Sequence, residues 1–247
     1  MTAGSREHFD QLAERYVELR AAPGFGDPVT EAVVEIARLR SGDVLDVGCG
    51  PGTVVGQLAR RFDVTAVGVD VSRPMIDVAR REVPEASFHV AAAEDLPFAE
   101  ATFDAVVMRM VVHHLDRPRA FAEMRRVLRP SGRLAITTTD PSGFESFWMK
   151  PFFPSYVRIE RARFPEGEVL RRELGDAGFE DARIHRLGIE RRFSRDEAMQ
   201  KLRGRGYSTF TLMTDAEYKS GVDEAERRLP PEIVYELRLL NVVATRP

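Results

Sequence analysis

A glycine-rich turn at residues 48–52 constrains the fold of this chain more than any other stretch. The apolar run of residues 43–47 leads into glycines at the alternate positions 48, 50 and 52, and an amphipathic run over residues 54–59 follows. This order predicts a buried strand, a tight loop and a helix. Glycines accept positive φ and leave no Cβ between the backbone and a ligand. The helix directs its N-terminal amides at the loop, and Asp46 adds a carboxylate, so the site suits a ligand that carries both charges.

Two common nucleotide-binding loops do not match this turn. A P-loop requires Lys followed by Ser or Thr after its last glycine, and this chain has Thr53-Val54. A dinucleotide fingerprint requires Gly-x-Gly-x-x-Gly, and its third glycine falls on Thr53 or Val55. A glycine turn in an unrelated α/β protein stays open as an alternative on these residues alone.

Beyond this turn, strand-like and helix-like runs alternate along the chain. Such alternation predicts βαβ units with a parallel sheet, in which ligands lie outside the carboxyl ends of the strands. The expected strands are 43–47, 64–69, 87–91, 103–108, 133–139, part of 179–193 and 233–245. The expected helices are 8–20, 29–39, 74–83, 119–128, 167–177, one from Ser194 and 214–229, with a turn at 129–132. The last strand is expected to be antiparallel.

Four signals in order resemble the class I S-adenosylmethionine (SAM)-dependent methyltransferases. They are Asp-x-Gly-x-Gly-x-Gly at 46–52, Gly-Val-Asp-Val-Ser at 68–72, the run 92–98 followed by Phe103-Asp104 and His113-His114-Leu115, and the turn before the strand at 133–139. The resemblance covers about residues 40–140. It implies an α/β fold with a doubly wound, mixed, seven-stranded Rossmann-like sheet and a helical, aromatic cap.

The resemblance also implies how the chain is divided. Residues 1–247 form a single methyltransferase domain with a SAM-binding core at about 41–139. The sheet is completed by about 166–193 and 230–247. The cap comes from about 1–30, 140–165 and 194–229.

By the same resemblance the cofactor is SAM, with S-adenosylhomocysteine as product. An acid at a strand end, here Asp70, holds the ribose hydroxyls, for which a carboxylate is a suitable acceptor. The family often carries Asp at the position of Ala92, so Glu94, Asp95 or backbone groups take its place at the adenine. The cofactor-binding residues expected are Tyr16, Arg20, Asp46, Gly48, Cys49, Gly50, Gly52, Thr53, Asp70, Val71, Ser72, Met75, Ala92, Ala93, Glu94, Arg109 and Met110.

His114 and His113 are the candidate catalytic residues. They follow the fourth strand. By the resemblance, residues at this position approach the methyl group of the cofactor. A neutral imidazole near its ordinary pKa suits a general base at neutral pH. The alternative is that one histidine packs behind the strand and the other shapes the pocket. No metal site is expected, because no His, Cys, Asp and Glu set has ligand spacing.

The aromatic segment 141–164 and two arginine clusters predict the acceptor site. Aromatic side chains enclose an apolar body, and an arginine fork binds a carboxylate or phosphate. A solvated arginine face is the alternative. The expected substrate-binding residues are Phe147, Trp148, Tyr156, Arg203, Arg205 and Tyr207.

These features predict methyl transfer to oxygen, nitrogen or carbon of a small, partly apolar molecule, with an anionic group as an option. The alternative is a SAM-binding protein on this fold that catalyses another reaction, such as cyclisation, or acts as a regulator. With 43% hydrophobic residues and a formal net charge of -3, the 247-residue chain predicts neither nucleic-acid nor membrane binding. One cysteine and no apolar leader indicate the cytoplasm. A monomer or homodimer is expected.

Overall fold

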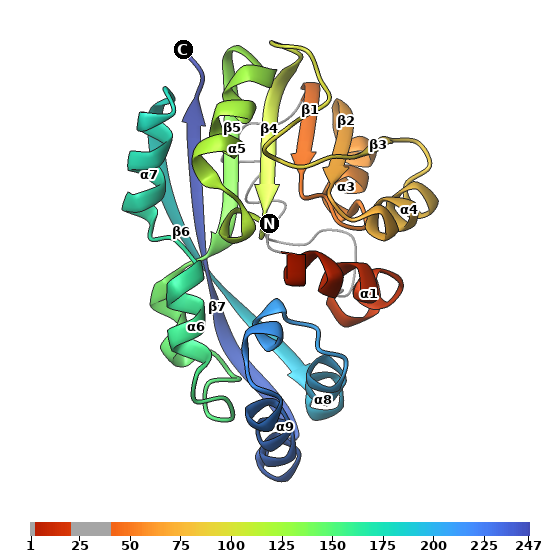
Figure 1. The fold of residues 1–247 in the computed structure, drawn as a ribbon, viewed down its shortest axis with the longest axis vertical. Coiled ribbons are helices and arrows are strands. Elements are labelled where there is room, and N and C mark those ends of the chain that lie inside the picture. Colours follow the sequence, from red (N-terminus) through yellow and green to blue (C-terminus); the bar gives the residue numbers. More distant parts are fainter. Residues whose placement is uncertain (1–2, 21–40) are drawn as a thin grey trace.

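A mixed seven-stranded sheet forms the centre of the computed structural model, which describes residues 3–20 and 41–247 (Figure 1). Its strand order is β3-β2-β1-β4-β5-β7-β6, with β1 to β5 parallel and β7 antiparallel to both neighbours. The strands are β1 (Ser41–Val47), β2 (Asp63–Asp70), β3 (Ser87–Val90), β4 (Phe103–Arg109), β5 (Leu128–Thr139), β6 (Glu180–Ser194) and β7 (Glu232–Thr245). The predicted α/β, doubly wound mixed sheet is confirmed.

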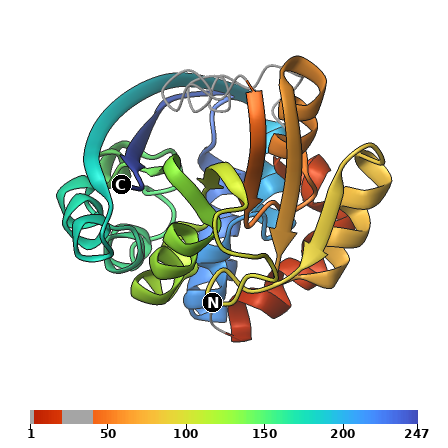
Figure 2. The ribbon, with the colours of Figure 1, turned by 90° about the horizontal axis from the view of Figure 1, so that it is seen from above.

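Helices cover both faces of this sheet (Figure 2). On one face α3 (Thr53–Arg61) and α4 (Arg73–Glu82) pack through Val55, Leu58 and Ile76. On the other face α5 (Arg117–Val127) and α7 (Gly167–Asp176) contribute Phe121 and Leu170 to the core. Because both faces are covered, the central strands are continuous apolar runs rather than alternating ones.

The strand order reverses at β1, which lies between β2 and β4. β2 and β3 extend to one side of β1, and β4 and β5 extend to the other. Ligands of such sheets bind at this switch point, outside the carboxyl ends of the strands. The side chains of Val44, Leu45 and Val47 at the end of β1 are buried in the core. Their packing fixes the position of Asp46 and of the glycine loop (residues 48–52) at this edge.

The last two strands continue past the sheet as a two-stranded ribbon, formed by residues 187–194 of β6 and 232–239 of β7. β5 pairs with β7 only as far as Leu239, so most of the ribbon has no further strand beside it. The ribbon carries the described cap, residues 140–165 and 194–229. Its elements are η2 (Pro141–Ser146), α6 (Tyr156–Arg163), α8 (Arg195–Arg203), η3 (Ser208–Leu212) and α9 (Asp215–Arg228).

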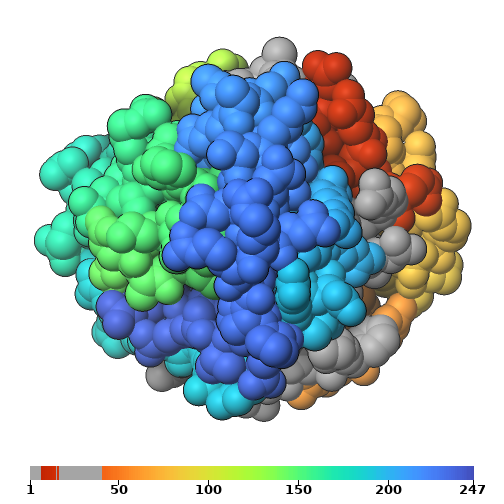
Figure 3. Space-filling model, turned by 90° about the horizontal axis from the view of Figure 1, so that it is seen from below, coloured from red at the N-terminus to blue at the C-terminus, as the bar shows by residue number. Residues whose placement is uncertain are grey.

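The cap has an apolar core of its own and closes one end of the molecule. Phe144, Phe153 and Phe210 are among its fully buried side chains. Figure 3, seen from this end, shows the cap segments as a continuous surface beside α1 (Ala3–Arg20) and α4. The predicted start of α8 is confirmed as a capping box, in which the Ser194 side chain and Glu197 bond each other's backbone amides.

Two local predictions differ from the structure. The helix predicted to reach Leu128 ends at Val127, and the turn predicted at 129–132 lies inside β5. Leu128 pairs with Phe103 and the pairing resumes at Arg133, so the residues between form a bulge, with Ser131 at φ 63°. The helix expected at 29–39 and residues 21–30 of the expected cap lie outside the described residues. In the described parts of the chain, no helix is long and apolar enough to cross a membrane.

Candidate active site

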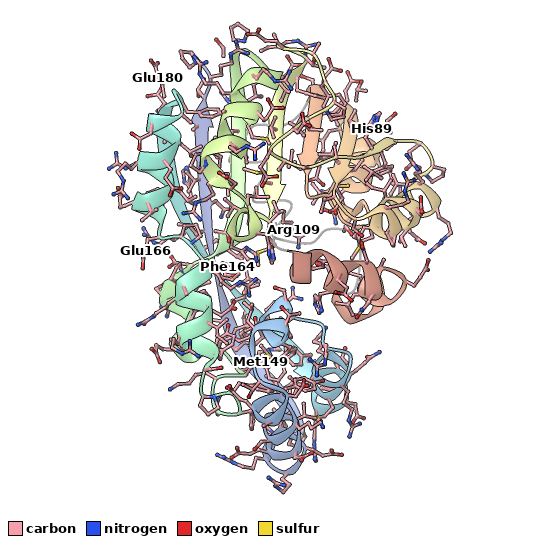
Figure 4. All side chains as sticks on the ribbon, in the orientation of Figure 1. His89, Arg109, Met149, Phe164, Glu166 and Glu180 are labelled. Atoms are coloured by element: carbon pink, nitrogen blue, oxygen red, sulfur yellow. The ribbon has the colours of Figure 1, made fainter. Side chains whose placement is uncertain are left out.

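A cavity of about 640 Å³ lies between the carboxyl edge of the sheet, helix α1 and the cap. The glycine loop and Arg109 line it from the sheet, and η1 (Val112–His114) contributes two histidines. Figure 4 shows Arg109 at the end of β4, facing the gap between sheet and cap, with Phe164 at the cap junction. The cavity is therefore at the switch point that the strand order predicts.

The glycine loop leaves one side open toward the cavity. Gly48, Gly50 and Gly52 all have positive φ. A Cβ on Gly48 would lie 2.6 Å from Val111, and one on Gly52 would lie 2.9 Å from the Phe88 ring. A Cβ on Gly50 would meet nothing within 4 Å, and Gly50 lines the cavity. Packing requires glycine at the two flanking positions, whereas Gly50 leaves space that a ligand can occupy.

Asp46 is a buried acid that lines the cavity. It is 2% exposed, and its Oδ2 has no hydrogen-bond partner in the described part of the chain. Burial raises the pKa of Asp46 to about 7, although the Arg109 guanidinium opposes the shift; the Asp70 charge raises it further. A buried acceptor without a donor is costly. The carboxylate is thus suited to a cationic, hydrogen-bond-donating ligand.

Asp70 connects the second strand to the glycine loop. Its Oδ2 accepts the Gly50 amide at 3.0 Å, and its Oδ1 accepts the Ser72 amide at 2.9 Å. Burial raises the pKa of Asp70, and the backbone amides oppose the shift. Ser72 caps α4 by accepting the Met75 amide. Asp70 therefore holds the loop that lines the cavity, and any hydroxyl bound there would add to these bonds.

The structure brings only some of the expected cofactor residues to the cavity. Those that line it are Tyr16, Asp46, Gly48, Cys49, Gly50, Gly52, Thr53, Arg109 and Met110. Asp70, Val71, Ser72, Met75, Ala92, Ala93 and Glu94 do not line it. Met75 packs against Ala13 of α1, and Glu94 accepts the Asp116 amide at 3.0 Å. The backbone of Arg20 ends α1, and its side chain lies outside the description.

Both candidate catalytic histidines line the cavity. The His113 ring stacks on Phe164, with centroids 3.9 Å apart, and His114 meets the edge of Phe9 at 5.5 Å. His114 Nε2 lies 3.5 Å from Arg163 Nη2. Burial and this positive neighbour lower the pKa of His114 to about 3. The expectation that this imidazole keeps its ordinary pKa is wrong.

A buried ion pair of the cap stands behind His114. Arg163 Nη1 bonds Glu160 Oε1 at 3.1 Å, and the same oxygen accepts the Thr209 hydroxyl at 2.8 Å. The second guanidinium nitrogen donates to Ser208 Oγ at 2.8 Å. Glu160 is 5% exposed, and Glu160, Ser208 and Thr209 line the cavity. The cap side of the cavity therefore contains a fixed polar patch among its aromatic side chains.

The expected acceptor-binding residues divide into two groups. Phe147, Tyr156 and Tyr207 line the cavity, and Phe147 stacks on Tyr156 at 5.2 Å. Burial raises the pKa of Tyr156, so its hydroxyl is neutral. The remaining three are Trp148, Arg203 and Arg205, and none of them lines it.

Each of these three has other contacts. Trp148 is buried behind the wall, 5.3 Å from the Phe193 ring. Arg203 pairs with Glu226 at 2.6 Å. Arg205 lies 3.9 Å above the Tyr218 ring and pairs with Asp215. The two arginines that are neighbours in the sequence are thus engaged outside the cavity.

Sequence reasoning did not single out several cavity residues. They are Phe9, Gln57, Arg60, Thr139, Glu160, Phe164, Arg191, Phe193, Ser208, Thr209, Tyr235, Leu237 and Leu239. The cavity residues of the ribbon could have been predicted from sequence. In Ile-Glu-Arg-Arg-Phe at 189–193 the residues alternate between two faces of a strand, and this alternation places one arginine on the apolar face. Glu160 and Thr209 carry none, because only the folded cap brings them together.

Comparisons with known proteins agree with this geometry. The sequence model described as "Methyltransferase domain" matches residues 45–136. The C-methyltransferase UbiE of ubiquinone and menaquinone biosynthesis from Geotalea daltonii is 34% identical over 214 residues, covering 74% of this chain and 91% of that protein. The O-methyltransferase cnsE of Penicillium expansum is 35% identical over 164 residues, covering 62% of this chain. That alignment spans 58% of the fungal protein's own length.

Solved structures share the fold at low sequence identity. The [4+2]-cyclase SpnF superposes with a TM-score of 0.67 at 20% identity, covering 98% of this chain and 97% of SpnF. At this identity the likeness concerns the fold and not the reaction. The relatives with higher identity are methyltransferases of oxygen and of carbon.

Proposed function

This chain belongs to the class I SAM-dependent methyltransferases, and we propose that it methylates an oxygen or carbon atom of a small, largely apolar acceptor held under the cap. The observation that carries the proposal is the cavity itself. One wall is the glycine loop with the buried Asp46, and the facing wall is rich in aromatic side chains and includes the polar patch around Glu160.

The residues of the sheet edge fit SAM. We propose that Asp46 Oδ2, which has no other donor in the described chain, receives the cofactor's ammonium group. The open side of Gly50 provides room for close backbone approach. Asp70, which holds the loop through the Gly50 amide, is the proposed ribose ligand. SAM supplies the sulfonium-bound methyl group, so the protein has to position the acceptor and exclude water.

The pKa of His114 restricts the kind of acceptor. Moving a proton from a hydroxyl of pKa ~10 to an imidazole of pKa about 3 costs about 10 kcal/mol. An enol or phenol with a pKa well below 10 needs less, and its anion needs no proton transfer. We therefore propose that neutral His114 hydrogen-bonds to an acidic hydroxyl, either the methyl acceptor itself or the enol or phenol oxygen that activates an accepting carbon. His113 shapes the wall by stacking on Phe164.

Side chains on the cap and ribbon suit an aromatic or polycyclic body. Phe147, Tyr156, Phe164, Tyr207 and Tyr235 line the cavity on this side. Rings of this kind prefer offset or edge contacts with a planar guest. Their enclosure also keeps water away from the transfer step. This wall distinguishes the site from an open groove for a macromolecule.

Methyl-labelled SAM tests the proposal. The protein would be incubated with labelled SAM and a panel of phenols, enols and quinols, and S-adenosylhomocysteine and labelled product would be measured together. We expect equal amounts of the two with at least one acidic acceptor. Tight SAM binding with neither product, across the panel and metabolite extracts, would favour a non-methylating role such as cyclisation.

A further inference from the structure

We propose that Arg191 on the ribbon, assisted by Lys201 of α8, binds an anionic group of the acceptor, a carboxylate or a phosphate. The inference rests on the proposed function and adds the chemical class of the acceptor: an apolar ring body with a negative end. Both residues line the same cavity as the glycine loop and the histidines.

The ribbon has two faces of opposite character. The residues on the inner face of β6 are Leu187, Ile189, Arg191 and Phe193, and those of β7 are Ile233, Tyr235, Leu237 and Leu239. Every one of them is at least half-buried, whereas the residues between them are exposed. Arg191 is therefore the charged member of an apolar face, directly opposite Tyr235.

The outer arginines of the ribbon are paired with acids. Arg192 contacts Glu190 at 2.8 Å and Glu232 at 3.6 Å, and Arg238 bonds Glu236 at 2.7 Å. The Arg191 side chain has no ion pair or hydrogen bond among the residues that the structure describes. A half-buried guanidinium has lost part of its hydration, and its planar fork matches carboxylate and phosphate oxygens. The position of Arg191 therefore suits the binding of an anion.

The surroundings determine what else the anion carries. Phe193, Tyr235 and Leu237 line the cavity around Arg191, so the group attached to the anion is apolar. Lys201 supplies a second positive charge from the cap side. The glycine loop and His114 line another part of this cavity. An acceptor that reaches both ends would therefore be fixed by its anion while its reacting atom lies near His114.

A matched pair of fluorescent probes separates charge from apolar contact. 8-Anilinonaphthalene-1-sulfonate and N-phenyl-1-naphthylamine share their rings and differ by the sulfonate. Each would be titrated into the protein saturated with S-adenosylhomocysteine, which occupies the cofactor part. Energy transfer from Trp148 would report binding next to the cap, since this single tryptophan lies against Phe193.

We expect Arg191→Met to weaken binding of the sulfonate probe about tenfold or more, because the variant loses a charged hydrogen bond. The neutral probe should change less than twofold. Arg191→Lys should restore part of the affinity. The control Arg192→Met, on the outer face of the same strand, should leave both probes within twofold. Equal weakening of both probes by Arg191→Met, or of neither, would overturn the proposal.

Acceptors extend the test to the reaction. Aryl acceptors that differ only in a carboxylate, a phosphate or a neutral amide would be compared. We expect Arg191→Met to raise KM for the preferred anionic acceptor about tenfold and to leave KM for the amide within twofold. If the wild-type protein preferred the neutral amide, the anion-binding inference would be refuted, but the proposed methyltransferase function would not. Absence of S-adenosylhomocysteine binding would instead refute the proposed function.

Discussion

Replacing Asp46 by Asn should lower SAM affinity and raise the stability of the unliganded protein. The carboxylate is 2% exposed, and its Oδ2 has no partner in the described chain. A hydrogen bond to a charged group contributes about 1.5–3 kcal/mol. Asp46→Asn should therefore raise the Kd for SAM about ten- to hundredfold at pH 8.

The pH dependence of binding follows from the raised pKa. The pKa of Asp46 is about 7, and a protonated carboxyl cannot pair with a cation. Titration of Asp46 should therefore make wild-type affinity weaker at pH 6 than at pH 8, by up to about tenfold. In the Asn variant this slope should vanish, because the titrating group is gone.

Stability should change in the opposite direction. The folded-state pKa lies above the ordinary value of 3.8, so the folded protein holds this proton where the unfolded chain has lost it. The contribution of Asp46 to stability is most favourable below pH 3.8 and falls as pH rises to about 7. At pH 8 the penalty is at most about 4 kcal/mol. Asp46→Asn should recover part of it.

Calorimetry at pH 6, 7 and 8 would measure affinity, and urea unfolding would measure stability. Asp43→Asn is the matched control, since this carboxylate on the same strand is exposed and pairs with Arg129. It should leave SAM affinity within twofold. If Asp46→Asn binds SAM with the wild-type Kd and the wild-type pH slope, Asp46 is not the ammonium ligand and the reasoning fails.

Four further substitutions, two of them combined in a double variant, test other parts of the site. Gly50→Ala should fold, because its Cβ would meet nothing within 4 Å and an alanine at φ +52° costs only about 1–2 kcal/mol. Calorimetry should nevertheless show a SAM affinity at least tenfold lower than that of the wild type. An unchanged affinity would mean that the ligand binds elsewhere. Asp70→Asn should weaken SAM about tenfold or more by loosening the Gly50 amide contact and the proposed ribose bond, and a twofold change would argue against this. Arg163→Met should lower the unfolding free energy by about 3–5 kcal/mol, because it leaves Glu160 buried without its counter-charge. Adding Glu160→Gln should restore part of that loss in urea unfolding, and a strictly additive double variant would contradict the pairing.

The sheet could be predicted from sequence because its signals are local. β1, β2 and β4 contain largely apolar runs that lead to polar residues at their ends, such as Asp46 and Asp70. The bulge at Ser131 escaped prediction for a physical reason. Arg-Pro-Ser-Gly has the composition of a turn, but the pairing of Leu128 with Phe103 keeps it within β5.

The sequence predicted that aromatic side chains line the acceptor wall, but not which charged residues lie there. Aromatic residues of the cap were expected at the cavity, and Phe147, Tyr156 and Tyr207 lie there. The two arginines expected to bind an anion do not line the cavity. Arg203 and Arg205 pair with acids of α9 outside the cavity. Contacts between α8 and α9 are not encoded in any local pattern.

Two of the three buried acids among the described residues, Asp46 and Glu160, line the cavity. Many ion pairs elsewhere, such as Arg192–Glu190, are largely exposed and contribute little to stability. Asp46 and the Glu160–Arg163 pair are buried, where desolvation is costly. A chain selected for stability alone would replace them by apolar side chains of similar size. Their presence at the two facing walls therefore fits groups that are stabilised when cofactor and acceptor bind. Ligand saturation should then remove more of the penalty at Asp46 than at any surface carboxylate.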